Sequence, residues 1–160
     1  MALIERMQKR PDLTYWEGKI PMNYVYTVGR AGEKFFQEFK NGKIFGAKCG
    51  ACDITYVPPR TYCEKCFARL EDSYINVGLR GTVHAFAECH EAFDGSRKDK
   101  PSIVAIVRID GTQGGLYHWL GKVSFSDVRI GMPVEAVFKT GKSRKGSILD
   151  IEYFKPVRAK

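Results

Sequence analysis

A mainly β fold is predicted for this chain, and three observations predict it. Two Cys-x-x-Cys pairs are separated by ten residues, and after residue 79 the strand-like runs become longer and regularly spaced. Five such runs follow, with a bridging segment between the third and fourth, which is the pattern of an OB-fold barrel. The predicted organisation is an aromatic segment and helix over residues 1–42, a four-cysteine zinc ribbon over 43–79 and a five-stranded OB-fold over 80–160. A generic small barrel or sandwich remains an open alternative for the last part.

Composition limits the class of protein. The chain has 160 residues, of which 44% are hydrophobic, and this is enough for one or two compact units. It contains no apolar run near 18 residues, and its first ten residues lack the apolar core of a signal peptide. Four of the five cysteines stand in metal-binding spacing, which indicates a reducing compartment. We therefore expect a cytoplasmic protein with no membrane partner.

The N-terminal region consists of an aromatic segment followed by a predicted helix. Residues 1–30 are rich in aromatics, including Tyr15 and Trp16, and either wrap over their own domain or present a surface to a partner. Residues 31–41 are predicted to form a helix that ends at Gly42. Three phenylalanines on one face of this helix are expected to join the core: Phe35, Phe36 and Phe39.

The two cysteine pairs carry the most specific signal in the sequence. The two-residue gap in each pair turns both thiolates toward one point, so two facing turns supply four sulfurs for a tetrahedral zinc ion. The residues are Cys49, Cys52, Cys63 and Cys66. Two disulfides and a rubredoxin-like iron site are the alternatives. Four cysteines leave no open coordination position, so the metal is expected to be structural.

Short strands flank these turns. Residues 43–48 lead into the first pair, residues 54–57 form the return strand, and residues 73–77 form the third strand of the ribbon. Pro58, Pro59 and Arg60 end the return strand, and Gly78 closes the unit.

The five barrel strands are predicted at residues 80–93, 103–110, 115–123, 134–139 and 147–154, with a helical turn within 125–131. Side chains alternate along a strand, so the even-numbered residues of the first strand, such as Phe86, are predicted on one face. The odd-numbered residues, such as Val83, are predicted on the other face. Cys89 lies in this strand and is expected to pack rather than to react.

Two predicted hairpin loops of the barrel are basic. Residues 94–101 carry Arg97, Lys98 and Lys100, and residues 141–146 carry Lys142, Arg144 and Lys145. In OB-folds these two loops flank the same ligand face, where converging cations would concentrate anions. The alternative is that they are solvated hairpin tips.

The order of motifs resembles a known family. The helix is followed by Gly46-Ala47-Lys48-Cys49-Gly50-Ala51-Cys52, the Pro-Pro-Arg turn, Cys63-Glu64-Lys65-Cys66, Gly81-Thr82-Val83 and the tail motif Arg129-Ile130-Gly131-Met132-Pro133-Val134 with Phe138. This pattern resembles the thiolase-associated family of rubredoxin-like zinc-ribbon/OB-fold proteins, and the resemblance covers nearly the whole chain.

The resemblance implies an accessory protein without catalytic residues that handles acyl-CoA. Members of the family pair with thiolase-fold enzymes, and one archaeal member bridges acetoacetyl-CoA thiolase and hydroxymethylglutaryl-CoA synthase. The small protein there helps to bind the pantetheine arm of CoA. By resemblance, Cys49, Cys52, Cys63 and Cys66 carry over as the metal ligands.

No family motif assigns the CoA contacts, so we choose the candidate residues by the chemistry of their side chains. The phosphates of CoA require several Lys or Arg, and Arg97, Lys98, Lys142 and Arg144 are the first candidates. The pantetheine arm suits an aromatic-lined groove, which Phe86 and Trp119 would line. Packing is the alternative role of these two aromatics.

Other functions remain open. OB-folds also bind single-stranded nucleic acid, and the sequence pI of about 9.3 agrees with such a role. Against it, residues 49–79 hold three Lys or Arg and four Asp or Glu, so the ribbon is not basic. Intrinsic catalysis would depend on His84, Glu88, His90 and His118, with no nucleophile motif present. Electron transfer would require iron in the four-cysteine site.

Overall fold

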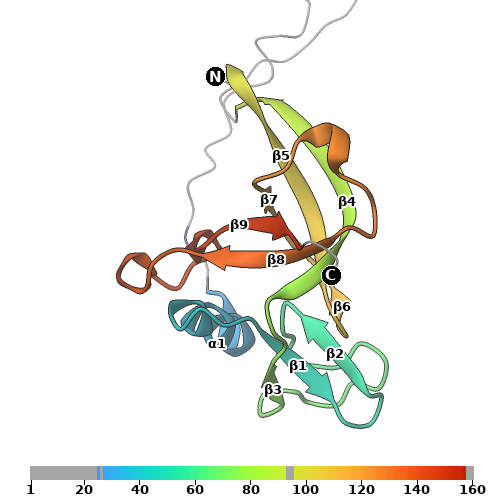
Figure 1. Cartoon of the computed structure of the whole chain (residues 1–160). Coiled ribbons are helices and arrows are strands. Elements are labelled where there is room, and N and C mark those ends of the chain that lie inside the picture. The colour runs from blue at the N-terminus through green and yellow to red at the C-terminus, as the bar shows by residue number, and fades with distance from the viewer. Residues whose placement is uncertain (1–24, 26, 93–95, 158–160) are drawn as a thin grey trace, which may run out of the picture.

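The computed structural model describes residue 25, residues 27–92 and residues 96–157. The aromatic segment predicted around Tyr15 and Trp16 lies outside these residues. Figure 1 shows a small sheet carrying the cysteine turns, a barrel beside it and one helix between them. No helix within the described residues is long and apolar enough to span a membrane.

Helix α1 runs from Gly29 to Lys40, close to the predicted range. Phe35 and Phe39 are buried and Phe36 packs against the same cluster, so the predicted apolar face is confirmed. The helix ends as predicted at Gly42, which has a φ of 69°. The Gly42 N–H donates to Phe39 and the Lys43 N–H donates to Glu38, which is the Schellman pattern of helix termination.

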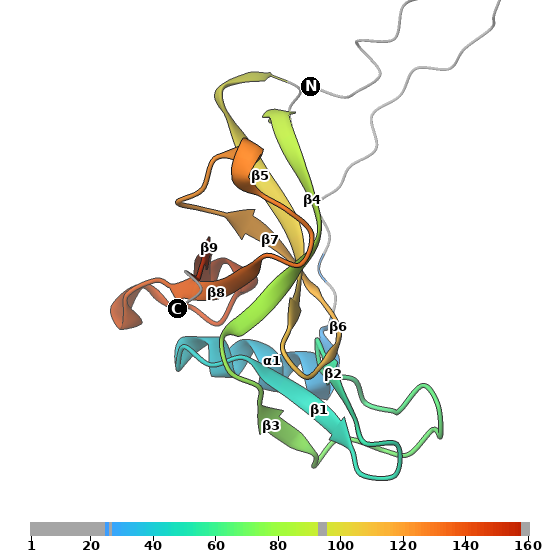
Figure 2. The ribbon, with the colours of Figure 1, turned by 45° about the vertical axis from the view of Figure 1, so that its right-hand side comes forward.

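The first sheet contains the ribbon strands and one strand from the barrel sequence. It consists of β1 (Phe45–Cys49), β2 (Ile54–Val57), β3 (Tyr74–Asn76) and β6 (Gln113–Gly114), in the order β3-β1-β2-β6. Strand β6, which the sequence analysis missed, pairs in parallel with β2 (Figure 2). The ribbon sheet is therefore completed by the barrel part of the chain.

The second sheet is a closed five-stranded barrel. Its strands are β4 (Arg80–Glu91), β5 (Arg97–Ile109), β7 (Leu116–Leu120), β8 (Pro133–Phe138) and β9 (Ile151–Pro156). The order β4-β5-β7-β9-β8, with β8 pairing back to β4 and β7 parallel to β9, is that of an OB-fold. The prediction of an OB-fold is thus confirmed over a generic sandwich.

Three short 3-10 turns complete the barrel part: η2 (Phe125–Asp127), η3 (Gly141–Ser143) and η4 (Ile148–Asp150). Turn η2 occupies the predicted bridging segment. Turn η4 replaces the start of the predicted last strand, because Ser147 and Asp150 cap it with a reciprocal pair of hydrogen bonds. The last strand therefore begins at Ile151.

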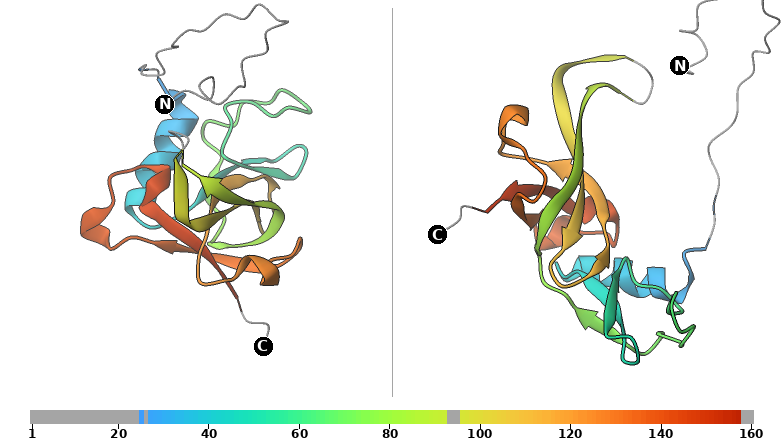
Figure 3. Two further views of the ribbon diagram at one scale, coloured as in Figure 1. Left: turned by 90° about the horizontal axis from the view of Figure 1, so that it is seen from above. Right: turned by 90° about the vertical axis from the view of Figure 1, so that its right-hand side faces the viewer.

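The hairpin of β4 and β5 is longer than predicted. Strand β5 begins at Arg97, not at residue 103, because its first residues continue to pair with the far end of β4. Figure 3 shows the hairpin rising away from the barrel. Arg97, Lys98 and Lys100 therefore lie on a strand rather than in a loop, and their predicted loop placement is wrong.

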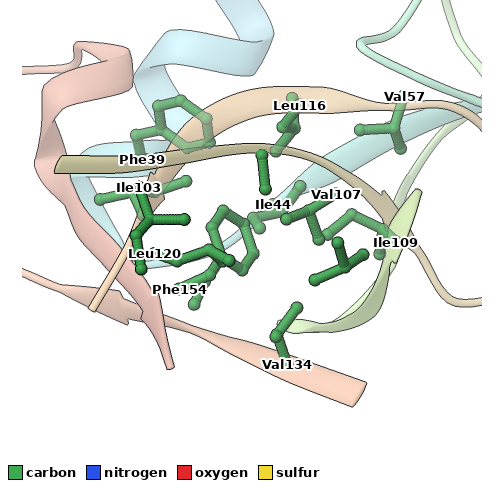
Figure 4. Packing of buried hydrophobic residues seen from close by; sticks show 14 of the residues in the cluster. Phe39, Ile44, Val57, Ile103, Val107, Ile109, Leu116, Leu120, Val134 and Phe154 are labelled. Atoms are coloured by element: carbon green, nitrogen blue, oxygen red, sulfur yellow. The ribbon is translucent and has the colours of Figure 1, made fainter. Parts of the chain in front are cut away.

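One core joins the helix to the barrel. The inward residues of the barrel strands pack with Phe35 and Phe39 of α1 and with Ile44 (Figure 4). A second, smaller cluster fills the ribbon around Tyr56, Leu70 and the buried cysteines. The ribbon thus has its own core beside the metal-binding turns.

Candidate metal centre and predicted ligand contacts

Two turns bring the four cysteines together. The first cysteine turn, residues 49–53, connects β1 to β2, and the second cysteine turn, residues 63–67, lies between β2 and β3. The four sulfurs all lie within 4.8 Å of one another. The sulfurs of Cys49 and Cys66 are 3.5 Å apart, and those of Cys52 and Cys63 are 3.9 Å apart.

These separations fit a tetrahedral metal site. Four sulfurs at about 2.3 Å from one zinc ion would lie about 3.8 Å from each other. A disulfide would require a separation of about 2.05 Å, and all five cysteines are free. The donor set of four thiolates suits zinc, and it also suits iron. With four protein ligands the site would be closed, and a metal held there would stabilise the fold without binding substrate.

The protonation of the sulfurs depends on their neighbours. The Tyr56 hydroxyl lies 3.3 Å from the Cys63 sulfur, and together with the backbone N–H of Cys66 it lowers the pKa of Cys63 to about 6. Contact with the Cys66 sulfur and burial raise the pKa of Cys52 to about 12. Cys63 is therefore the more readily deprotonated of the two thiols, whereas Cys52 would release its proton only when a metal binds.

The residue after each second cysteine has a left-handed backbone. Asp53 has a φ of 51° and Phe67 has a φ of 57°. Asp53 also forms an ion pair with Lys48, with Nζ and Oδ1 3.0 Å apart. This conformation lets the chain turn back after each pair, and a short polar side chain such as that of Asp53 tolerates it well.

Two of the predicted CoA contacts lie together. The Lys98 ammonium sits 5.2 Å from the centre of the Trp119 ring and donates a hydrogen bond to Ser102 at 2.5 Å. Trp119 is 40% exposed. The structure thus brings these two candidates into one cation–π pair on the outer face of the barrel sheet.

Phe86 lies on the opposite face of that sheet. Strand β4 has an irregularity between Val83 and Ala85, where two steps on β4 match one step on β5. This moves Phe86 onto the inward side, where it faces Ala105 and packs against the barrel core and the ring of Phe125. Because alternation cannot continue through a bulge, the predicted separation of Val83 and Phe86 onto opposite faces is wrong.

The basic loops do not converge. The β4–β5 hairpin rises above the barrel, whereas the β8–β9 loop that carries Lys142 projects to its side (Figures 1 and 2). Arg97 and Lys142 are exposed. Arg144 is engaged within the chain, since its Nε donates to the Lys139 carbonyl at 2.7 Å. Within the described residues, the two elements that carry the predicted basic loops therefore point in different directions.

An apolar outer face was missed by the sequence analysis. Cross-strand pairing aligns Ala85, Ile106 and Tyr117 in one row and Ala87, Val104 and Trp119 in the next. Ile106 and Tyr117 are 40% and 66% exposed. The signal for this face was the unbroken apolar run at residues 103–107, because a strand that is apolar at every position covers both faces of its sheet.

The titratable residues weighed for catalysis do not form a site. His90 pairs with Glu88 at 3.0 Å on the projecting hairpin, and His84 is exposed at the β4 irregularity. His118 is buried, and its Nε2 lies 3.1 Å from the Ile148 carbonyl. Burial lowers the pKa of His118, because the charged form of the ring is disfavoured inside the barrel.

The fold and the cysteine cluster define a rubredoxin-like zinc ribbon followed by an OB-fold. Residues 36–71 match the model of the ChsH2 rubredoxin-like zinc ribbon domain, and residues 74–139 match that of the ChsH2 C-terminal OB-fold domain. Together the two matches cover more than half of the chain, and the chain belongs to the ChsH2 family.

Two solved structures show the same fold. A DUF35-family protein of unknown function from Sulfolobus solfataricus is 25% identical, with a TM-score of 0.62 over 81% of this chain and 87% of that one. The Ltp2–ChsH2(DUF35) aldolase is 20% identical, with a TM-score of 0.62 over 82% of this chain and 98% of that one. A comparison with curated protein sequences gave no match.

Proposed function

We propose that this chain is a non-catalytic accessory subunit that docks on a thiolase-fold enzyme and helps to hold its acyl-CoA thioester. The motifs of the sequence support the partner, since they resemble those of thiolase-associated proteins. One solved relative is itself named as an Ltp2–ChsH2(DUF35) aldolase, a name that joins a family member to a second component. Hydroxymethylglutaryl-CoA synthase is the second partner that the resemblance implies.

The observation that carries the non-catalytic role is the closed geometry of the cysteine cluster. Four sulfurs within 4.8 Å of one another would fill the coordination of a zinc ion. The Glu88–His90 pair lies on the hairpin, while His118 faces the barrel interior. A scaffold of this kind would raise the effective concentration of a tethered acyl group between two active sites, through geometry alone.

The acyl-CoA contacts are proposed on the outer face of β4, β5 and β7. Lys98 beside Trp119 would meet a phosphate, and the apolar rows that contain Ile106 and Tyr117 would cover the pantetheine arm. Arg97 and Lys142 remain proposed phosphate contacts, and Phe86 and Arg144 would contribute by shaping the barrel.

The proposal is tested by purifying the full chain with its partners from its native source and identifying them by mass spectrometry. Recovery of a thiolase-fold enzyme is expected, with zinc bound to the small chain. In the recovered complex, Lys98→Glu is expected to weaken acetyl-CoA binding about tenfold in calorimetry, as one charged contact is worth about 1.4 kcal/mol. Lys43→Glu, at an exposed lysine just after α1 and outside the proposed face, serves as the matched control. Turnover of a thioester by the small chain alone would overturn the proposal.

Single-stranded nucleic acid is the second candidate ligand. Tyr117 and Trp119 are exposed on the same face of the third barrel strand, beside Lys98, and such aromatics can stack bases. A gel shift with a labelled oligonucleotide at rising salt distinguishes the two functions. Binding that weakens steeply with salt, together with copurification of RNA, would favour this candidate.

A further inference from the structure

The second cysteine turn contains a bulky apolar residue in a conformation that suits glycine. The φ of Phe67 is 57°, where the Cβ of an L-residue crowds the backbone. Of the non-glycine residues with positive φ in the described ranges, namely Asp53, Phe67 and Lys122, only Phe67 is apolar. Nothing in the turn itself requires a ring here, since Asp53 makes the same turn after the first pair.

Burial within the chain does not compensate for this strain. Phe67 is 77% exposed and lies outside both hydrophobic clusters. Tyr62, on the other side of the same cysteine pair, is 56% exposed. An aromatic that is both strained and exposed in the free chain gains its favourable contacts only when another surface covers it.

The turn holds these aromatics in a fixed arrangement. The Phe67 N–H donates to the Cys63 carbonyl at 2.9 Å, and the Cys63 N–H donates to the Ala68 carbonyl at 2.9 Å. Tyr62 forms a bridge with Arg69. Because the backbone around Phe67 is fixed in the free chain, docking its ring would cost little conformational entropy.

Charges around the turn indicate the chemistry of the complementary surface. Residues 60–69 contain three basic side chains and one acidic one. Arg60 pairs with Glu64 and Arg69 pairs with Glu71, while Lys65 is exposed at the tip. A matching surface would have an apolar pocket for the ring and a carboxylate at its rim for Lys65.

We propose that Phe67, supported by Tyr62, inserts into an apolar, acid-rimmed pocket of the thiolase-fold partner and anchors the ribbon to it. This inference rests on the proposed function for the identity of the partner. It adds the place of contact, the tip of the second cysteine turn. That place lies on the ribbon, whereas the proposed acyl-CoA face lies on the barrel.

The decisive variant is Phe67→Gly in the full-length, zinc-loaded chain. Glycine relieves the left-handed strain, so zinc content is expected to be unchanged and the melting temperature equal or higher. The affinity for the purified thiolase-fold partner, measured by calorimetry, is expected to fall at least tenfold. Phe67→Tyr keeps a ring and should bind within about threefold of wild type. Ile130→Ala, at a residue 72% exposed on the barrel, is the matched control and should bind as wild type.

Each other outcome has a defined meaning. If the wild-type chain does not bind a thiolase-fold enzyme, the proposed function is wrong, and the proposed role of Phe67 is wrong with it. If wild type binds and Phe67→Gly binds equally well, only the anchor is wrong. If Phe67→Gly loses zinc, its loss of affinity is not informative, and Phe67→Asn and Tyr62→Ser are measured instead. If both of these variants retain zinc and bind the partner as tightly as wild type, the proposed anchor is wrong. An equal loss in Ile130→Ala would also contradict a specific anchor.

Discussion

Arg144 and Lys40 are in contact although 104 residues separate them in the sequence. The Nη1 atom of Arg144 lies 3.4 Å from the Lys40 carbonyl oxygen, at the C-terminal end of α1, and its Nε donates to Lys139. The guanidinium also lies over the ring of Phe138. One side chain thus satisfies one helix-end carbonyl and fastens the β8–β9 loop to the helix.

Arg144→Ala is expected to destabilise the fold. It removes two hydrogen bonds to backbone carbonyls and the packing over Phe138, and we expect a loss of about 1–2 kcal/mol. Urea unfolding followed by circular dichroism measures this loss. Lys145→Ala, in the same loop and exposed, should leave the midpoint unchanged. If both variants unfold at the wild-type midpoint, Arg144 does not link the loop to the helix.

Gly114→Ala is expected to break the connection between ribbon and barrel. A Cβ at this position would lie 2.1 Å from the Val57 carbonyl oxygen, in the parallel pairing of β6 with β2. We expect a loss of about 3 kcal/mol in urea unfolding. Gly111→Ala is the matched control, since Gly111 also has a positive φ but nothing lies within 4 Å of its added Cβ. A loss of only about 1 kcal/mol is expected there. Equal losses would show that the close approach is unimportant.

Cys63→Ser is expected to remove the metal and unfold the ribbon. Metal binding contributes folding free energy in small cysteine-rich units, and the ribbon core around Tyr56 includes this cysteine. Elemental analysis should give about one zinc per wild-type chain and far less for the variant. Cys89→Ser, at a cysteine outside the cluster, should keep its zinc. A Cys63→Ser chain with full zinc and native amide exchange in the ribbon would contradict the structural role.

His118 predicts a dependence of stability on pH. Burial lowers the pKa of His118 in the folded chain below its ordinary value of 6.5. As the pH falls, His118 is therefore protonated at a higher pH in the unfolded chain than in the folded chain. The free energy of unfolding decreases as the pH drops below about 6.5. The slope should stay below the about 1.4 kcal/mol per pH unit of one full proton.

His118→Gln is the corresponding variant. Its amide can still donate to the Ile148 carbonyl but does not titrate. Urea unfolding of zinc-loaded protein from pH 7.5 to 5.5 should give a steeper decline for wild type than for the variant. Parallel curves would assign the decline to other groups.

Local patterns in the sequence predicted the features that depend on local chemistry. The spacing of Cys49 and Cys52, and of Cys63 and Cys66, sets a turn within each pair, and the two turns do face each other. The helix followed from the repeat of Phe35 and Phe39, and its end followed from Gly42. The order and number of barrel strands also followed from regular spacing.

The features that were missed depend on contacts between distant residues. The β-bulge at His84 changes which side chains of β4 point into the barrel after that residue. A pattern of alternating residues does not reveal a bulge, because the bulge depends on pairing with β5. The two residues of β6 carry no strand signal, since the strand exists only by pairing with β2. From the sequence alone, Arg144 is indistinguishable from a solvent-exposed loop residue, because its partner at the end of α1 is distant in the sequence. For the same reason Lys98 and Trp119 could be nominated separately, but their contact could not be foreseen.

The parallel pairing of β2 and β6 has a consequence for dissecting the molecule. All four residues of β2 are buried, and β6 covers one edge of this strand. A fragment that stops before Arg80 would expose the edge of an apolar, β-branched strand, which is a template for intermolecular association. Excised ribbons should therefore self-associate, and soluble pieces for biochemical work would need either the intact chain or a charged residue introduced along that edge.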